Sequence, residues 1–197
     1  MSINDQEHPD TSTPEDQLIL LAGAGDNHAF SLLYERYVTK IFNYIYYRTG
    51  NIPEAEDLTE RVFYRALGHI SSYKNMGLPF SAWLYRIAHN LVANWHRDNA
   101  RRKEYPLEDH VNLPFHGDHP EVTMMKDQEQ GKLLSIIREL PEERQIVVIL
   151  KFVEHLSNSE IAVIMNRSEG AIKSLYHRTL LQLRNDIMAG NDNEGDE

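Results

Sequence analysis

The sequence predicts an all-α protein of two small helical domains joined by a long flexible linker, with a helix-turn-helix in the second, four-helix domain. Three observations support this. Apolar residues recur at three- and four-residue steps through most of the chain, which is typical of amphipathic helices. No segment shows the sustained period-two alternation of strands. The helical pattern fails over residues 104–126, where three prolines and scattered acids indicate a linker.

The first domain is expected over residues 17–103. Asp26 is a suitable N-cap for a long helix, which Gly50 and Pro53 then break. Apolar steps over residues 55–70 predict the next helix, and a loop follows at 71–79.

A third amphipathic helix of this domain begins at Phe80. It carries Trp83 and Trp95 on either side of a polar stripe. We expect Trp83 in the core, because tryptophans at helical spacing usually pack inward, and the pattern leaves the place of Trp95 open. The stripe consists of Arg86, Asn90, Asn94, Arg97 and Arg101. Basic groups beside aromatic rings suit single-stranded DNA, because every base offers a face for stacking.

The second domain is expected over residues 127–188, and its end shows the pattern of a helix-turn-helix. Ser157 to Glu160 fits a capping box that starts a short helix. Asn166 tolerates the left-handed backbone of a tight turn, and Ser168 can cap the next helix. If Ile172, Tyr176 and Leu183 point inward, the opposite face carries Lys173, Ser174, His177 and Arg178. Such a face can enter the major groove of DNA, although a plain helical hairpin is the alternative.

The net charge of −10 hides two locally basic surfaces. The first 20 residues and the last 12 each hold five acids and no Lys or Arg, so residues 21–185 are neutral. We therefore expect disordered acidic tails at residues 1–16 and 189–197. Residues 95–103 have four bases against one acid, and residues 166–185 have the same balance. The local field decides where an anion docks.

Other features argue against an enzyme, a metal site and a cofactor. The chain has no cysteine, which removes disulfides and thiolate metal sites and suits a reducing cytoplasm. His116 to His119 could bind a metal but stands in the proline-bearing linker, so we expect no metal site. No signal peptide, membrane span or catalytic constellation is evident. We therefore expect a cytoplasmic binding protein.

Five segments, taken together, resemble the extracytoplasmic-function (ECF) sigma factors, specificity subunits of bacterial RNA polymerase. In order, they are GDNHAFSLLYERY, AEDLTERVFYRAL, PFSAWLYRIAHNLVANWHRDNARR, LPEERQIVVILKF and EIAVIMNRSEGAIKSLYHR. One such motif is weak, whereas five in the family's order are specific. The resemblance implies binding to core RNA polymerase through its β′ clamp and β flap, binding to promoter DNA, and an anti-sigma factor partner.

The resemblance also implies a role for each surface. Core polymerase would bind Asp57, Leu58, Glu60, Arg61, Phe63 and Tyr64. The opened −10 strand would bind Tyr73, Lys74, Arg86, Asn90, Asn94, Trp95, Arg97 and Arg101. The −35 duplex would bind Arg167, Ser168, Glu169, Lys173, Ser174, His177 and Arg178. The chain departs from the family at Glu60-Arg61, where Gln-Glu is usual, and at Asn94-Trp95.

Two other functions compete with this interpretation. A stand-alone helix-turn-helix regulator would bind duplex DNA without polymerase, and it predicts a dimer on a palindromic site. The chain offers no evident dimer helix, and the mixed-charge face around Asp57 would then be merely solvated or dock some other helix. An enzyme with a DNA-binding appendage lacks a catalytic constellation.

Overall fold

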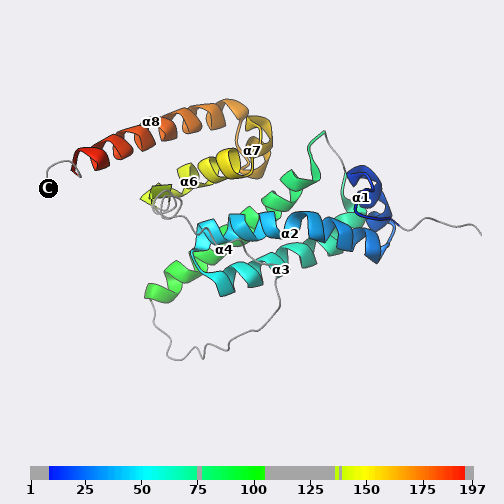
Figure 1. Ribbon diagram of the computed structural model, residues 1–197. Helices are drawn as coiled ribbons and strands as arrows, with labels where there is room; N and C mark the ends of the chain where they lie inside the picture. The colour runs from blue at the N-terminus through cyan, green and yellow to red at the C-terminus, as the bar shows by residue number, and fades with distance from the viewer. Residues whose placement is uncertain (1–8, 75–76, 105–135, 138, 194–197) are drawn as a thin grey trace, which may run out of the picture.

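The computed structural model describes residues 9–74, 77–104, 136–137 and 139–193, and the described residues are helical with no strand (Figure 1). The helices of the first domain are α1 (Glu15–Gly23), α2 (Asn27–Thr49), α3 (Ile52–His69), η1 (Ile70–Ser72) and α4 (Phe80–Glu104). Those of the second are α6 (Glu142–Val148), the π-helix η2 (Ile149–Val153), α7 (Asn158–Ile164) and α8 (Glu169–Asn193). The prediction of an all-α protein with two helical domains is confirmed.

Local capping fixes the helix ends of the first domain. The side chain of Asp26 accepts hydrogen bonds from the backbone N–H groups of His28 and Ala29, at 2.8 and 3.1 Å. Gly50 ends α2 in the left-handed conformation with φ of 67°, which glycine adopts without steric cost. Asn51 then caps α3 by accepting from the N–H of Glu54 at 3.1 Å. These caps let two helices join with a two-residue turn.

Helices α2, α3 and α4 pack side by side, and α1 lies against α2 (Figure 1). Their shared core is apolar and tightly buried, and Ile41, Ile45, Val62, Leu84 and Ala88 are each fully buried. Two buried tyrosines, Tyr44 and Tyr85, cross in a T-shape with ring centroids 5.5 Å apart. This three-helix platform leaves one face of α3 and one face of α4 for partners.

The second domain contains the expected helix-turn-helix in α7 and α8. The capping box at Ser157 and Glu160 is present. Asn166 takes φ of 52° in the turn, and the Ser168 hydroxyl accepts from the N–H of Ala171 at 3.2 Å. Ile172 and Leu183 are buried, so α8 turns its opposite face outward.

The segment boundaries differ from those expected. α1 begins at Glu15, and the segment before it is bound to α2, because Arg36 donates to the carbonyls of Thr11 and Thr13. Residues 9–16, which belong to the expected tail, therefore have a defined place against the first domain. α8 continues to Asn193, past the expected boundary at 188. Most of the predicted linker 104–126, residues 127–135 and the last four residues lie outside the described residues.

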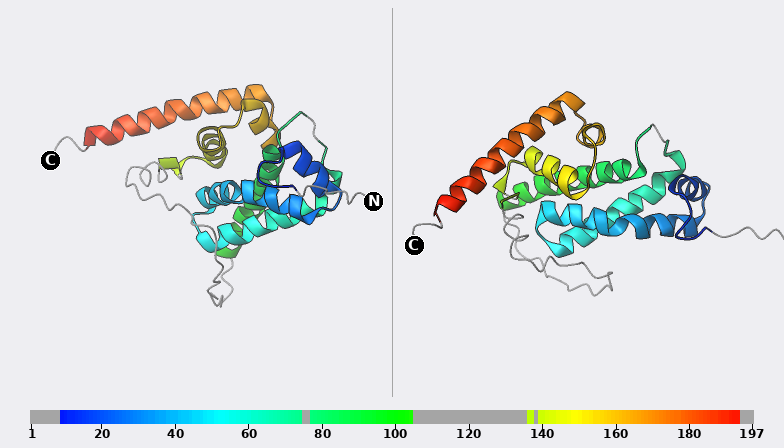
Figure 2. Two further views of the ribbon diagram at one scale, coloured as in Figure 1. Left: turned by 45° about the vertical axis from the view of Figure 1, so that its right-hand side comes forward. Right: turned by 45° about the horizontal axis from the view of Figure 1, so that its top comes forward.

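The two domains pack against each other. η2 contacts α2, and α7 contacts α4 near the beginning of that helix (Figure 2). Their buried apolar side chains form one continuous cluster. Nothing in the sequence pattern predicted this contact, because the residues that meet are separated by about half the chain.

Candidate polymerase and promoter interfaces

The exposed face of α3 carries four of the six residues predicted to bind polymerase. Asp57, Glu60, Arg61 and Tyr64 are exposed, and Tyr64 is 81% exposed. Arg61 pairs with Asp57 at 3.5 Å, one helical turn away. Both partners are more than half exposed, so this pair contributes little to stability.

The other two predicted residues, Leu58 and Phe63, lie in the core. Leu58 is 1% exposed and Phe63 is 5% exposed. The Phe63 ring packs edge-on against Tyr34 with centroids 4.8 Å apart. Neither side chain is available to a partner in this structure, and both instead hold α3 against the platform.

Leu67 is a further residue of this face that the sequence motif did not single out. It is 47% exposed and stands three residues after Tyr64 on α3, which puts the two on the same side of the helix. Two large apolar side chains among charges resemble the centre of a protein–protein interface. In the sequence, Leu67 differs from most other apolar residues of this helix because its position does not fall on the face that is buried.

The polar stripe of α4 is displayed as predicted for the side chains that the structure describes. Arg86, Asn90 and Arg97 are exposed, and Asn94 is partly buried. Arg97 donates to the side-chain oxygen of Asn94 at 2.7 Å. The side chain of Arg101 lies outside the described residues. The stripe offers cations and amides along one side of the helix.

A pocket of about 460 Å³ opens where the loop before α4 meets that helix. Its walls include the predicted residues Tyr73, Lys74 and Arg86. They also include Trp83, which is only partly buried and packs against Tyr73 with ring centroids 5.0 Å apart. The expectation that Trp83 is a core residue was therefore wrong, because the side chain lies at the edge of the core. The pocket joins aromatic faces to two cations.

Tyr73 remains a neutral phenol at this pocket. Burial, and then the carboxylates of Glu15 and Asp16, raise the pKa of Tyr73 above its ordinary value of 10.0. Its hydroxyl donates to the carbonyl of Leu78 at 3.5 Å, and its partly buried ring packs against Phe80 and Trp83.

Trp95 is held between α3 and α4. Its indole N–H donates to the Glu54 carboxylate at 2.7 Å. The ring lies beside Asp57, Arg61 and Asn94 in a small polar pocket. Trp95 therefore stands between the exposed face of α3 and the polar stripe of α4, and its indole N–H is already bonded.

The predicted −35 residues all lie on the surface at the beginning of α8 and in the turn before it. Arg167, Ser168, Glu169, Lys173, Ser174, His177 and Arg178 are exposed. Lys173 pairs with Glu169 at 2.8 Å, and Arg167 pairs with Glu143 of α6. Arg178 donates weakly to the carbonyl of Ser174 at 3.4 Å. The face is basic, but two of its cations have acidic partners.

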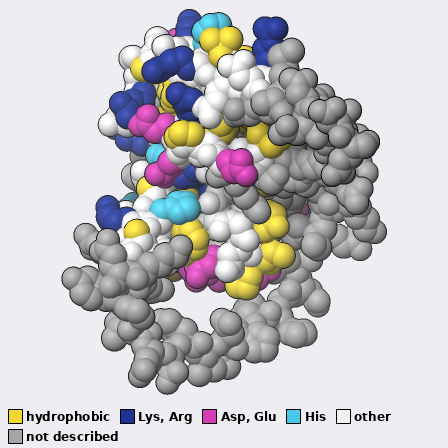
Figure 3. Space-filling model, turned by 90° about the vertical axis from the view of Figure 1, so that its left-hand side faces the viewer, with side chains coloured by type: hydrophobic (Ala, Val, Ile, Leu, Met, Phe, Trp, Pro, Cys, Tyr) yellow, Lys and Arg dark blue, Asp and Glu magenta, His cyan; other side chains and the backbone are white. Residues whose placement is uncertain are grey.

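The charge distribution over the molecule is local rather than uniform. On the face that Figure 3 shows, Lys and Arg side chains gather toward the upper left, and acidic side chains lie closer to the middle. A net negative chain thus presents basic areas to solvent. Within the described ranges, no three His, Asp or Glu side chains group as a metal site. His116 to His119 lie outside the described residues, and no described helix is long and apolar enough to cross a membrane.

Burial of two histidines on α4 makes stability depend on pH. Burial, and secondly Arg48, lower the pKa of His89 and His96 below 6.5. Between pH 6.5 and these lowered pKa values, the unfolded chain therefore binds more protons at the two histidines than the folded chain does. The contribution of these two histidines to the free energy of unfolding is fully present above pH 6.5. It is lost as pH falls through their lowered pKa values.

We expect the melting temperature to drop between pH 7.5 and pH 5.5, and to drop less in His89→Gln. Glutamine is neutral at both pH values and can still accept from Tyr44, whose hydroxyl lies 3.5 Å from His89 Nδ1. Thermal melts followed by circular dichroism measure the difference. An equal drop in the variant and the natural protein would show that His89 contributes nothing to it.

Comparisons with known proteins agree with the presence of these two helical domains. Residues 33–102 match the family model of Sigma-70 region 2, and residues 130–183 match that of Sigma-70 region 4. The chain is 36% identical to the ECF RNA polymerase sigma factor BldN of Streptomyces coelicolor over 85% of its length, and it spans 63% of that protein. It is 31% identical to the ECF sigma factor SigW of Bacillus subtilis, over 83% of this chain and 91% of SigW.

A solved structure shares the fold. The sigma factor RpoE of Bartonella quintana, solved with the anti-sigma factor NepR, matches with a TM-score of 0.65 and 20% identity. The match covers 85% of this chain and 98% of RpoE. The region 2 match runs from within α2 to near the end of α4 and so covers most of the α2–α4 platform, which a stand-alone helix-turn-helix regulator would not need. The chain therefore belongs to the extracytoplasmic-function (ECF) sigma factors of RNA polymerase, the subunits that direct promoter recognition.

Proposed function

We propose that the exposed face of α3 binds the β′ clamp of core RNA polymerase through Asp57, Glu60, Arg61, Tyr64 and Leu67. The observation that supports this is the pair of exposed apolar side chains, Tyr64 and Leu67, within a charged rim. Large apolar side chains at the centre with charges around them are typical of a binding surface. Leu58 and Phe63 would support this face from below.

The pocket before α4 and the polar stripe of that helix would capture the opened −10 strand. Tyr73 and Trp83 provide aromatic faces for a displaced base, while Lys74 and Arg86 neutralise phosphates at the pocket mouth. Arg97 and Asn90 extend the same surface along the helix. Trp95, which lies beside Asn94 and donates its N–H to Glu54, would also hold α4 against α3 at this surface.

The outward face of α8 would read the −35 element as duplex in the major groove. Lys173 and His177 lie one turn apart on this face, and Arg178 follows directly after His177, as suits a groove-reading helix. Ser168, Ser174 and Glu169 border it. Few cations face outward, and two of the cations around this face, Arg167 and Lys173, are paired with acids. The affinity of this domain alone would be weak, and polymerase would hold it in place.

The protein would act by binding energy and catalyse no reaction itself. Residues 17–103 and 127–188 would form the two functional domains, with residues 104–126 as the tether between them. The β flap would bind the second domain. An anti-sigma factor is a further partner by analogy with RpoE and NepR. The cytoplasm, where polymerase works, would be the place of action.

Reconstitution with core polymerase tests this function. Run-off transcription from cognate promoters, identified by sequencing transcripts after forced expression, should require the chain. Failure to bind core at micromolar concentration would contradict the proposal.

Arg178→Ala should weaken −35-dependent transcription and reduce the salt dependence of promoter binding by about one unit of log–log slope, because one phosphate contact is lost. Arg178 is exposed and bonded only weakly within its own helix, so the fold should be unaffected. Holoenzyme binding to promoter DNA at several salt concentrations measures the slope. Affinity for core should stay unchanged, and its loss would refute the assignment of α8 to DNA.

A further inference from the structure

Tyr73 forms part of the wall of a second pocket, which has a volume of about 380 Å³ and lies between α1 and η1. Among the described residues, Tyr73 is the only wall residue that this pocket shares with the pocket of about 460 Å³ before α4. Cavities of roughly 300–1,000 Å³ are typical of small-molecule sites, so the second pocket has room for a planar base. We call it the α1 pocket.

Two elements contribute apolar side chains to the wall of the α1 pocket. α1 packs against η1, the short turn that follows α3 (Figure 1). The two approach closely at Gly23, where an added Cβ atom would lie 3.5 Å from the carbonyl oxygen of Ile70. Ile70 is buried, whereas Ile19 is only partly buried and Leu20 is 73% exposed. The flat face of a base would therefore cover apolar surface that otherwise meets water.

The charges of the two pockets differ in sign. Among the described residues, the only charged side chain in the wall of the α1 pocket is Asp16, which is exposed. The wall of the pocket before α4 contains Lys74 and Arg86 instead. A carboxylate repels phosphate, and the two cations attract it. A strand bound at both pockets would therefore keep its phosphates beside Lys74 and Arg86 and place only a base in the α1 pocket.

The polar groups of the α1 pocket favour one of the four bases. Guanine is the only base whose Watson–Crick edge has two adjacent donors, N1–H and N2–H, which one carboxylate accepts together. On the other three bases each donor stands next to an acceptor, which would face the oxygens of Asp16 and repel them. The exposed Ser71 hydroxyl, also in the wall, can donate to guanine O6.

We propose that the α1 pocket captures a second unpaired base of the opened strand, a guanine, whose N1–H and N2–H groups donate to Asp16. The inference rests on the proposed function, in which the first base enters the pocket of Tyr73, Trp83 and Arg86. Because Tyr73 belongs to both walls, the two captured bases are close together in the strand. Asp16 then determines specificity at a promoter position beyond the first captured base.

Inosine tests the proposed contact, because it differs from guanine only in lacking the N2 amino group. Guanine and then inosine are placed at each position of the opened strand in fluorescently labelled, premelted promoter fragments. Anisotropy measures their affinity for the holoenzyme formed by core polymerase and the full chain. We expect one position at which inosine weakens binding roughly tenfold, and no such difference in Asp16→Ala. A guanine preference of the same size in Asp16→Ala would overturn the proposal.

Glu35→Ala is the matched control for Asp16→Ala. Glu35 is an exposed acid on α2 and is not in the wall of the α1 pocket. Each variant removes one negative charge, so both should raise the affinity for every fragment by a similar small factor. Only Asp16→Ala should abolish the preference for guanine over inosine. If both variants lost that preference, the charge of the domain and not the pocket would set it, and the proposal would fail.

Ser71→Leu tests the pocket without a change of charge. Ser71 is an exposed wall residue, so leucine should fill part of the pocket and reduce the guanine preference while the chain stays folded. An unchanged preference in this variant would mean that the base binds elsewhere.

Arg86→Ala separates a failure of this inference from a failure of the proposed function. Arg86 lies in the wall of the first pocket, so its loss should weaken binding of all fragments alike. If it does so while no position prefers guanine, the α1 pocket proposal fails and the proposed function stands. If Arg86→Ala has no effect, the proposed function fails. A loss of affinity for core polymerase in Asp16→Ala would assign the α1 pocket to a polymerase contact and overturn the proposal.

Discussion

Replacing Tyr64 and Leu67 together by alanine is expected to weaken binding to core RNA polymerase by about 30-fold or more without unfolding the protein. Both side chains are large, apolar and exposed, at 81% and 47%. Truncating a tyrosine at the centre of an interface commonly costs at least about 2 kcal/mol of binding free energy. Neither side chain supports the core, so the melting temperature should be nearly unchanged.

Leu20→Ala provides the matched control. Leu20 is another exposed apolar side chain of the first domain, 73% exposed, but it lies on α1 rather than α3. Competition binding against a labelled sigma factor measures affinity for core, and circular dichroism measures folding. An equal loss of affinity in the control would mean that general surface hydrophobicity, and not the α3 face, drives binding.

Local signals in the sequence were sufficient to place most helix ends. Asp26, Ser157 and Ser168 cap helices as predicted, because a cap depends on residues within one turn. The stripe of α4 was also found, because helical spacing alone decides which residues share a face. These features need no knowledge of the tertiary structure.

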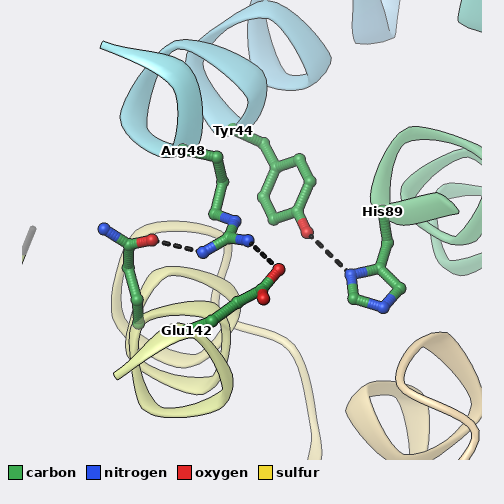
Figure 4. A network of polar contacts seen from close by, with 5 residues as sticks. Tyr44, Arg48, His89 and Glu142 are labelled. Atoms are coloured by element: carbon green, nitrogen blue, oxygen red, sulfur yellow. Dashed lines mark hydrogen bonds and ion pairs between the residues drawn. The ribbon is translucent and has the colours of Figure 1, made fainter. Parts of the chain in front are cut away.

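The remaining features depend on contacts between distant segments. Trp83 was expected in the core, yet it is only partly buried and lines a pocket with residues of other segments, among them Tyr73 and Leu78. The burial of Arg48 could not be predicted from the sequence, because its partners, on α6, are 94 and 97 positions further along the chain (Figure 4). The ordering of residues 9–14 likewise depends on Arg36, which composition could not reveal.

Phe63→Ala is expected to destabilise the protein by about 3–5 kcal/mol, in contrast to the change at its neighbour Tyr64. Phe63 is 5% exposed and packs on Tyr34, so truncation leaves a cavity under α3. Domains of this kind are stable by only about 5–15 kcal/mol, and the loss is a large part of that. Urea denaturation should show a lower midpoint with an unchanged slope.

Substitutions at Phe63 and Tyr64, which are neighbours on α3, therefore distinguish an effect on folding from an effect on polymerase binding. Phe63→Ala should lower core binding only in proportion to the fraction of chains that unfold, and cooling or an added stabilising osmolyte should restore it. Tyr64→Ala should lose affinity while fully folded, so neither treatment should help. Phe63→Leu, which keeps most of the buried volume, should regain most of the stability. If Phe63→Ala kept its urea midpoint and still lost core affinity, Phe63 would contact polymerase directly and α3 would have to shift when it binds.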